Sequence, residues 1–343
     1  MTENRKKPII IAGPCSAESR EQVFSTAAAL KKEGVDWFRA GLWKPRTHPG
    51  HFEGVGEAGL PWLAEVRDSL DMKVATEVAF REHVEKCLEA GIDTIWIGAR
   101  TTSNPFLVQE LADALAGTDV TVLVKNPINP DIELWMGALE RFRRAGISKL
   151  GAIHRGFSSY EKVRYRNAPG WQIAIEFRSR CPEIPFFCDP SHLAGSREYI
   201  AELSQRSLDL GLDGLMIESH CDPAHALSDA RQQITPEELG ALIRGLHTRE
   251  SDSDDSANRE QMALLRKRID EIDDRLLKAL GERMALSREI GEFKKEHNIS
   301  IIQTQRWDAL MDKVLHEAPG YSLREDFVKS FFSIIHDASI EEQ

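Results

Sequence analysis

The sequence lacks the features of membrane-spanning and nucleic-acid-binding proteins. No apolar stretch approaches the ~18 residues that a membrane span needs, and the apolar run after MTENRKKP is too short for a signal peptide. Lys and Arg number 44 against 55 Asp and Glu, which gives a net charge of −11, and no long run of basic residues occurs. This charge balance argues against a nucleic-acid-binding surface.

Cysteine is scarce and scattered. Five cysteines, an odd number, are spread over 343 residues, which favours free thiols in a reducing compartment over a disulfide framework. We therefore expect a cytoplasmic protein that contacts no membrane and no nucleic acid. At ~150 residues per domain the length predicts about two domains.

A polar, acidic stretch divides the chain. Residues 248–260, TRESDSDDSANRE, hold almost no apolar side chain and cannot bury enough surface to offset their ordering entropy. We interpret them as a linker or a frayed helix start. The predicted domains are residues 1–247 and 261–343.

Short β-rich runs recur eight times before this linker. They are PIIIAGP, VDWFRAG, KVATEV, TIWIGAR, TVLVKN, ISKLGAIHR, IPFFCDP and DGLMIES. The gaps between them each have room for a helix, and helix-start signals stand at Pro105 and at the capping box Thr235 to Glu238. Near-continuous apolar strands that alternate with helices predict an α/β fold with a parallel sheet, here a (β/α)8 TIM barrel. An open doubly wound sheet is the alternative, but its glycine fingerprint is absent.

The pattern after the linker is helical. Residues 258–297 contain no proline and place apolar residues at helical spacing, as at Leu265, Ile269 and Ile272. Such a helix is ~60 Å long, too long for a domain of this size to cover, so we expect a homodimer formed through it. Shorter helices are predicted over residues 303–316 and from the capping box Ser322 to Glu325. A small all-α, three-helix domain results.

Charged and metal-ligating residues gather at the predicted strand ends, where TIM barrels place their active sites. Six basic side chains at one mouth would be costly without anions, so we expect at least two anionic groups to bind there. A mixed sulfur, nitrogen and oxygen donor set suits a divalent transition ion, although a buried cysteine and a capping aspartate are the simpler explanation. The strand-end residues are Cys15, Arg39, Glu77, Arg100, Lys125, Arg155, His192 and Glu218, with Lys44, Arg46, Thr47 and Asp229 in adjacent loops.

The motifs GPCSAES, FRAGLWKPRTHPG, GEAG, ATEV, IGAR, VKNP, IHRGF, CDPSH and MIES…ALSD together resemble the type Iβ 3-deoxy-D-arabino-heptulosonate 7-phosphate (DAHP) synthases. The resemblance covers the whole barrel in order. It implies condensation of phosphoenolpyruvate with erythrose 4-phosphate, helped by one divalent metal ion and no organic cofactor. We expect Mn²⁺, with Fe²⁺, Co²⁺ or Zn²⁺ as alternatives.

The resemblance also assigns residues to roles. The metal ligands would be Cys15, His192, Glu218 and Asp229, with His220 as a competitor of His192. Phosphoenolpyruvate would bind through Arg39, Lys44, Arg100, Lys125 and Arg155, and the phosphate of erythrose 4-phosphate through Arg46 and Thr47. Lys44 and Glu77 are the candidates for moving protons.

Three features qualify this resemblance. His48 follows Thr47 where relatives often have Ser or Thr. The N-terminal regulatory domain of some relatives is expected to be missing, because Pro8 already lies in the first strand. The alternative family is the 3-deoxy-octulosonate 8-phosphate synthases, which usually read KANRS where this chain reads KPRT.

Helix geometry brings two cations of the second domain together. Arg283 and Lys294 are eleven residues apart, so they lie about 20° apart around a helix axis and can converge on one small anion. Arg266 cannot reach that ligand from the same helix, but the Arg266 of an antiparallel partner could. The simpler interpretation is a set of solvated surface charges.

The stretch LRKRIDEIDDRLLKALGERMALSREIGEFK resembles the AroQ-class chorismate mutases, from about Met262 to the last residue. The resemblance implies that chorismate rearranges to prephenate with its carboxylates on Arg283 and the partner's Arg266. Ser339 would also bind it, and Lys294 and Gln343 would hold its ether oxygen. One departure is that Gln303 and Trp307 stand where the best-known members carry an acidic pair.

Together these resemblances predict a bifunctional shikimate-pathway enzyme with transferase and isomerase activities. We also expect the helical domain to mediate feedback inhibition of the barrel by chorismate or prephenate. The alternative is a helical domain that only senses the effector and dimerises without catalysis.

Overall fold

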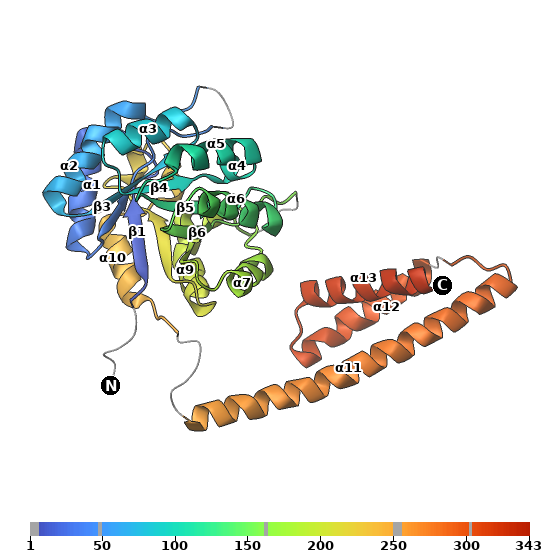
Figure 1. The fold of residues 1–343 in the computed structure, drawn as a ribbon. Helices are drawn as coiled ribbons and strands as arrows, with labels where there is room; N and C mark the ends of the chain where they lie inside the picture. Colours follow the sequence, from blue (N-terminus) through green and yellow to red (C-terminus); the bar gives the residue numbers. More distant parts are fainter. Residues whose placement is uncertain (1–6, 47–49, 161–163, 250–255, 302–303) are drawn as a thin grey trace. The chain divides into compact units, whose positions relative to one another are not determined.

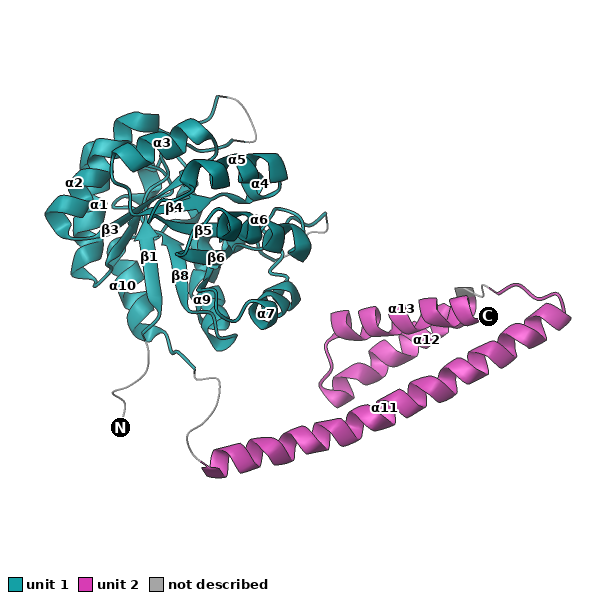
Figure 2. Ribbon diagram, in the orientation of Figure 1, with its two compact units in different colours: residues 1–251 teal, residues 252–343 magenta. Residues whose placement is uncertain are grey.

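The computed structural model describes residues 7–46, 50–160, 164–249, 256–301 and 304–343. The chain forms two compact units, Met1–Ser251 and Asp252–Gln343, coloured separately in Figure 2. Each unit is described by itself below. Within the described residues no helix is both long enough and apolar enough to cross a bilayer.

The first unit is a closed barrel of eight parallel strands in chain order, in which β1 is hydrogen-bonded to both β2 and β8 (Figure 1). This closure confirms the TIM barrel prediction, and the open-sheet alternative is wrong. The strands are β1 Ile9–Gly13, β2 Trp37–Arg39, β3 Lys73–Val78, β4 Thr94–Ile97, β5 Thr121–Lys125, β6 Leu150–His154, β7 Phe186–Cys188 and β8 Gly214–Glu218.

Helices follow the strands and surround the barrel (Figure 1). The two helix-start signals are confirmed: Asn104 caps the helix that opens at Pro105, and Thr235 and Glu238 form a reciprocal capping box. The α-helices are α1 Arg20–Lys32, α2 Leu60–Leu70, α3 Arg81–Glu89, α4 Ala99–Thr102, α5 Pro105–Leu115, α6 Ile132–Arg144, α7 Trp171–Arg180, α8 Pro190–Ala194, α9 Ile200–Asp209 and α10 Pro236–Gly245. Short 3₁₀ turns cover Gly56–Gly59, Arg197–Tyr199, Pro223–His225 and Ala230–Gln232.

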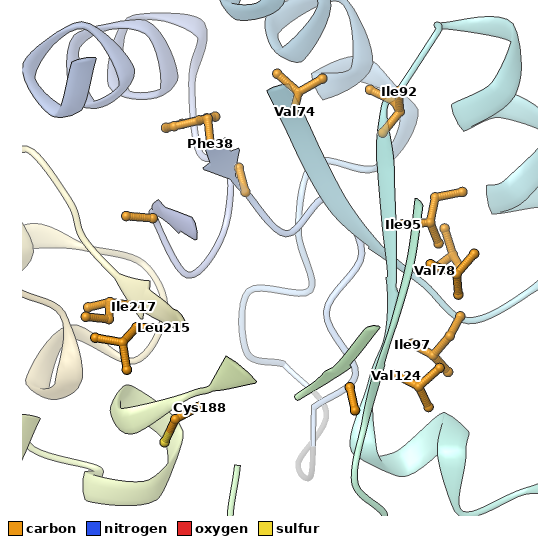
Figure 3. Close-up of a cluster of buried hydrophobic side chains, with 14 of the residues drawn as sticks. Phe38, Val74, Val78, Ile92, Ile95, Ile97, Val124, Cys188, Leu215 and Ile217 are labelled. Carbon is orange, nitrogen blue, oxygen red and sulfur yellow. The ribbon is translucent and has the colours of Figure 1, made fainter. Parts of the chain in front are cut away.

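The strands bury side chains on both faces. Outward-facing side chains such as Ile95, Ile97 and Val124 belong to the core between strands and helices (Figure 3). Alternate residues face inward and fill the barrel, so the barrel is a packed core rather than a pore. This inner cluster consists of Ile11, Ala75, Trp96, Leu123, Ile153, Phe187 and Met216.

The C-terminal strand ends carry charge above this apolar filling. Arg39 ends β2, Lys125 ends β5 and Glu218 ends β8, and all three are buried. Because the strands are parallel, these ends meet at one mouth of the barrel.

The second unit contains three helices, as predicted: α11 Ser256–Glu296, α12 Thr304–Glu317 and α13 Glu325–Glu342, with a 3₁₀ turn over Ala318–Tyr321. Helix α11 packs against α13, and α12 packs against α13 as well. The first helix begins at Ser256, inside the stretch 248–260 that we interpreted as a linker or frayed helix start.

The predicted capping box at Ser322 is wrong. Ser322 has a φ of 57° and ends the 3₁₀ turn, whereas an N-cap residue needs an extended backbone. Helix α13 instead begins after Arg324, whose side chain makes no capping hydrogen bond.

A row of apolar side chains on α11 stays exposed within this single chain. Exposed apolar faces of this kind are typical of protein–protein interaction sites. The exposed residues are Met262, Leu264, Leu265, Ile269, Ile272, Leu276, Leu277, Leu286, Ile290 and Phe293.

Candidate active sites

A cavity of about 250 Å³ opens at the C-terminal strand ends of the barrel. It collects nine of the residues predicted for this site, drawn from all eight strands or the loops that follow them. These residues are Cys15, Arg39, Lys44, Glu77, Arg100, Lys125, Arg155, His192 and Glu218.

Three possible metal ligands meet at one side of this cavity. Ligand atoms of Cys15, Glu218 and Asp229 all lie within 4.8 Å of one another. His192 stands beside them, with its Nε2 3.7 Å from Oε1 of Glu218. That carboxylate oxygen is buried and accepts no hydrogen bond from the described residues. A buried anionic oxygen without a donor fits a cation ligand, and the sulfur, nitrogen and oxygen donors together fit a divalent transition ion.

Neighbouring polar groups orient these ligands. The Nδ1 of His192 lies 2.8 Å from Oδ2 of Asp189, which leaves Nε2 facing Glu218. Gln232 donates a hydrogen bond of 2.7 Å to the second oxygen of Glu218. The carbonyl oxygen of the Gln233 side chain accepts the backbone N–H of Cys15 at 2.8 Å. Gln232 and Gln233 were not found in the sequence, because they lie 14 and 218 residues from their partners and leave no spacing signal, whereas Asp189 stands three residues before His192 in the CDPSH motif.

The competitor histidine lies elsewhere. Nδ1 of His220 accepts the backbone N–H of Asp222 at 2.8 Å, and its Nε2 lies 3.5 Å from a carboxylate oxygen of Glu18. His220 is not part of the group formed by Cys15, Glu218 and Asp229.

Burial and charge set the protonation of the donors. Burial, reinforced by the Glu218 carboxylate, raises the pKa of the Cys15 thiol to about 12. Burial lowers the pKa of His192 even though Asp189 opposes this, which favours the neutral ring that a ligand needs.

Lys44 contacts two of the possible metal ligands and lines the same cavity as the cations. Its ammonium group contacts the sulfur of Cys15 and lies 2.7 Å from Oδ2 of Asp229. Burial lowers the pKa of Lys44, but the negative groups around it outweigh burial and hold the pKa above its usual value. The same ion pair holds the pKa of Asp229 below its usual range, although burial acts in the opposite direction.

Cationic side chains line the same cavity. Arg39 is only 2% exposed, and its Nε and Nη1 have no hydrogen-bond acceptor among the described residues. Burial lowers the pKa of Arg155 to about 10, and nearby Arg166 and Arg100 add to that effect. Buried N–H donors that are surrounded by other positive charges are suited to binding carboxylate or phosphate groups.

A second pocket of about 230 Å³ adjoins the first and contains Arg46 together with Lys44, Arg100 and Arg155. The predicted binding residue Thr47 and its neighbour His48 lie outside the described residues.

Arg166 and Asn167 are site residues that the sequence analysis missed. Arg166 lies 3.6 Å from Asp229, and the Asn167 side chain accepts a hydrogen bond of 2.9 Å from Arg155. Both line the main cavity because an antiparallel bridge between Phe157 and Ala168 folds their loop back to the barrel mouth. They follow β6 at a distance, so a search restricted to strand ends could not find them.

The helical unit brings four predicted residues together within one chain. Arg283 donates a hydrogen bond to Oγ of Ser339, and Lys294 donates one of 2.8 Å to the side-chain oxygen of Gln343. Gly291 makes this possible, because a Cβ there would stand 2.8 Å from the Cα of Gln343. These two hydrogen-bonded pairs, a cation with a hydroxyl and a cation with an amide, make up the cationic cluster of this unit.

Of the remaining predicted residues of this unit, the structure describes Arg266 and Trp307. Arg266 is exposed on α11, seventeen residues before Arg283. The Trp307 ring stacks on His336 with 4.2 Å between ring centroids. Gln303 lies outside the described residues.

Fold and site together define a barrel whose cavity combines possible ligands of a divalent ion with several cations, followed in the chain by a helical unit with its own cationic cluster. Comparison with known proteins identifies both parts. Residues 2–251 match the family model of the DAHP synthetase I family, and residues 265–343 match that of chorismate mutase type II. The chain belongs to the DAHP synthetase I family and carries a chorismate mutase domain.

Individual relatives agree with this assignment. The phospho-2-dehydro-3-deoxyheptonate aldolase of Thermotoga maritima is 35% identical over 236 residues, which are 68% of this chain and 68% of that protein. A 2-dehydro-3-deoxyphosphooctonate aldolase of Rhodopseudomonas palustris is 30% identical over 69% of this chain and 86% of its own.

Solved structures agree as well. The crystal structure of the Thermotoga maritima DAHP synthase has a TM-score of 0.63 and 33% identity, and covers 70% of this chain and 68% of its own. A truncated form from the same organism has a TM-score of 0.60 and 31% identity, and covers 70% of this chain and 85% of its own. The protein is thus a bifunctional shikimate-pathway enzyme with DAHP synthase (transferase) and chorismate mutase (isomerase) activities.

His154, which precedes Arg155 at the end of β6, provides a pH-dependent test of this site's packing. It is fully buried, and burial lowers its pKa to about 4. Between about pH 6.5 and 4 the unfolded chain binds a proton at this residue and the folded chain does not, so stability falls as pH falls. His154→Phe should remove up to about 3 kcal/mol of this acid-induced loss. Urea unfolding of both proteins at pH 7 and pH 4.5 measures it, and identical pH dependences would contradict the assignment.

Proposed function

We propose that the barrel condenses phosphoenolpyruvate with erythrose 4-phosphate to give DAHP and inorganic phosphate. The observation that supports this most directly is the cavity that brings the donors Cys15 and Glu218, with Asp229 beside them, together with the cations Arg39 and Arg155. An enol phosphate carboxylate and an aldehyde phosphate both require such cations. Their joining requires a way to polarise the aldehyde.

The chain's own residues position the two substrates. Phosphoenolpyruvate would bind through Arg39, Lys44, Arg100, Lys125 and Arg155, and erythrose 4-phosphate through Arg46 and Thr47. C3 of phosphoenolpyruvate then forms a bond to the aldehyde carbon, water adds to C2, and phosphate leaves by C–O cleavage. Lys44 and Glu77 line the same cavity and are our candidates for moving the protons that these steps require.

We propose that Cys15, His192, Glu218 and Asp229 hold one divalent ion, with Mn²⁺ first and Fe²⁺, Co²⁺ or Zn²⁺ as alternatives. When bound, the ion supplies Lewis-acid polarisation of the aldehyde oxygen. Asp189 and Gln232 keep the His192 and Glu218 ligands oriented.

Removal and return of the metal tests this proposal. EDTA treatment should abolish DAHP formation, and Mn²⁺ should restore it. In Asp229→Asn the Mn²⁺ concentration for half-maximal activity should rise by about 10- to 100-fold, because a ligand charge is lost. The matched control is Asp222→Asn on the same loop, whose carboxylate pairs with exposed His225. Full activity of metal-free protein, or equal effects of the two variants, would contradict the metal assignment.

A second candidate is condensation with a five-carbon aldose phosphate to give an octulosonate phosphate. The similarity to 2-dehydro-3-deoxyphosphooctonate aldolases, at up to 30% identity, supports this second candidate. The 35% identity to the heptonate aldolase and the KPRT motif favour the four-carbon substrate. A competition assay with both aldose phosphates, read by product mass, distinguishes the two.

We propose that the helical unit rearranges chorismate to prephenate. This Claisen rearrangement needs no nucleophile, only a substrate held in its chairlike form and a cation near the ether oxygen. Arg283 and Ser339 would bind the substrate, and Lys294 and Gln343 would hydrogen-bond the ether oxygen. Trp307 stands where an acidic residue would contact the substrate hydroxyl, which leaves a purely effector-sensing unit as the alternative. Prephenate formation by the enzyme decides between them.

We propose that the mutase site is completed in a homodimer, with Arg266 reaching the partner's cluster. The exposed apolar residues of α11 supply the interface.

Mixed dimers test this sharing of residues. Arg266→Ala and Arg283→Ala should each lower mutase activity at least about 100-fold as homodimers. After subunit exchange, half of the dimers hold both variants and one of their two sites is intact, so about a quarter of wild-type activity should return. Arg288→Ala, which alters an exposed ion pair on α11, is the control and should stay active. If mixing restores nothing, Arg266 does not act across a dimer.

We also propose that the helical unit mediates feedback inhibition of the barrel by chorismate or prephenate. An effector shifts the barrel only through different affinities for two arrangements of the units. The five free cysteines support a cytoplasmic enzyme.

Deletion of residues 250–343 should therefore abolish inhibition of DAHP formation by either compound. Arg283→Ala in the full chain should weaken inhibition too, because it removes the effector's cation without removing the unit. DAHP synthesis is followed at increasing effector concentration, and inhibition that survives deletion would place the effector site in the barrel.

A further inference from the structure

One indole ring at the base of the barrel cavity contacts three charged groups. Trp96, on β4, is 1% exposed and belongs to the inner apolar cluster. The guanidinium carbon of Arg39 lies 4.6 Å from its ring centroid, and the ammonium of Lys125 lies 5.8 Å from it. Its Nε1 donates a hydrogen bond of 2.9 Å to Oε2 of Glu77. All three charged side chains line the cavity.

The ring supports Arg39 without using up its N–H donors. An aromatic face attracts a guanidinium through the ring quadrupole, so no hydrogen bond is consumed. Only Nη2 of Arg39 is engaged, with the Cys15 carbonyl at 3.1 Å and Glu218 at 3.5 Å. Nε and Nη1 have no acceptor among the described residues. Glu218 pairs with Nη2 alone, and the Trp96 ring packs against the guanidinium without occupying Nε or Nη1, so these two donors stay available to an anion.

The edge of the same ring orients Glu77. Glu77 and Trp96 are register partners on β3 and β4, so the indole N–H reaches the carboxylate directly. The other oxygen, Oε1, occupies the space of a missing side chain, since a Cβ on Gly98 would lie 2.1 Å from it. One oxygen is thus held by Trp96 while the carboxylate faces the cavity.

We propose that Trp96 is a positioning residue for the condensation, one whose ring face sets Arg39 and Lys125 for substrate binding and whose N–H sets Glu77 for the reaction. This inference rests on the proposed condensation of phosphoenolpyruvate with an aldose phosphate. Trp96 itself touches neither the donor set nor the reacting atoms, so its effect is exerted through the groups it holds.

Two substitutions separate the two contributions. Trp96→Phe keeps an aromatic face and removes the N–H, so kcat should fall about 10-fold while the KM for phosphoenolpyruvate changes less than about 3-fold. Trp96→Leu removes the face as well, so the KM for phosphoenolpyruvate should rise about 10-fold in addition. Steady-state kinetics of the full, metal-loaded enzyme measures both.

The matched control is Trp135→Phe. Trp135 is also fully buried and also donates its Nε1 hydrogen, to the Val124 carbonyl at 3.1 Å, but it lies in the layer between strands and helices. Trp135→Phe loses the same indole donor without touching the cavity, so kcat and KM should stay within about twofold of wild type. An equal loss of kcat in both variants would show that Trp96 only fills space, and would overturn the proposal.

A double variant tests the route through Glu77. If the indole N–H acts by orienting Glu77, Trp96→Phe should lower kcat no further in a Glu77→Gln background. Multiplicative losses would overturn that part of the proposal. Failure of the proposed function is distinguishable, because it shows as wild-type protein that forms no condensation product. A thermal unfolding scan of each variant verifies that the kinetic effects come from folded protein.

Discussion

The structure depends on the balance of buried charge at the barrel mouth. Arg39, Lys125, Glu218 and Asp189 are all buried, and each would be unstable alone in a medium of low polarity. Their pairing is close: Lys125 lies 2.6 Å from Asp189, and Arg39 lies 3.5 Å from Glu218. The pairing is also incomplete, because donors of Arg39 and an oxygen of Glu218 lack hydrogen-bond partners among the described residues. The unsatisfied oxygen of Glu218 is suited to binding a cation, and the unsatisfied donors of Arg39 are suited to binding substrate anions.

The barrel architecture separates these charged groups from the apolar core. The inner cluster below the mouth is apolar and tightly filled, so the charged groups are confined to the ends of the strands. Trp96 lies between the apolar cluster and the charged mouth. Its ring packs in the cluster, its face contacts Arg39, and its N–H donates a hydrogen bond to Glu77. The same residue therefore belongs to the apolar core and contacts the charged groups of the cavity.

Much of the fold and part of the site could be predicted from the sequence. Strands such as β4, Thr94–Ile97, are buried on both faces, so most of their residues are apolar and they are visible as runs. Residues at strand ends, such as Arg39 and Glu218, followed from the rule that parallel strands present their ends together. Arg166 and Asn167 could not be predicted, because a backbone bridge folds their loop back to the mouth and no local sequence pattern indicates that bridge. The capping box at Ser322 was predicted wrongly, because the local sequence matches that motif but the residue has a left-handed backbone and ends a turn.

The direct measurement is the absorption spectrum of the EDTA-treated enzyme titrated with Co²⁺. A cysteine thiolate and neighbouring oxygen and nitrogen ligands around one ion predict an intense thiolate-to-cobalt charge-transfer band that saturates at one ion per chain. The band should vanish in Cys15→Ser and persist in Cys221→Ser, since Cys221 is an exposed thiol on the loop after β8. A titration that shows no such band, or a band that survives Cys15→Ser, would contradict a metal centre at the barrel mouth.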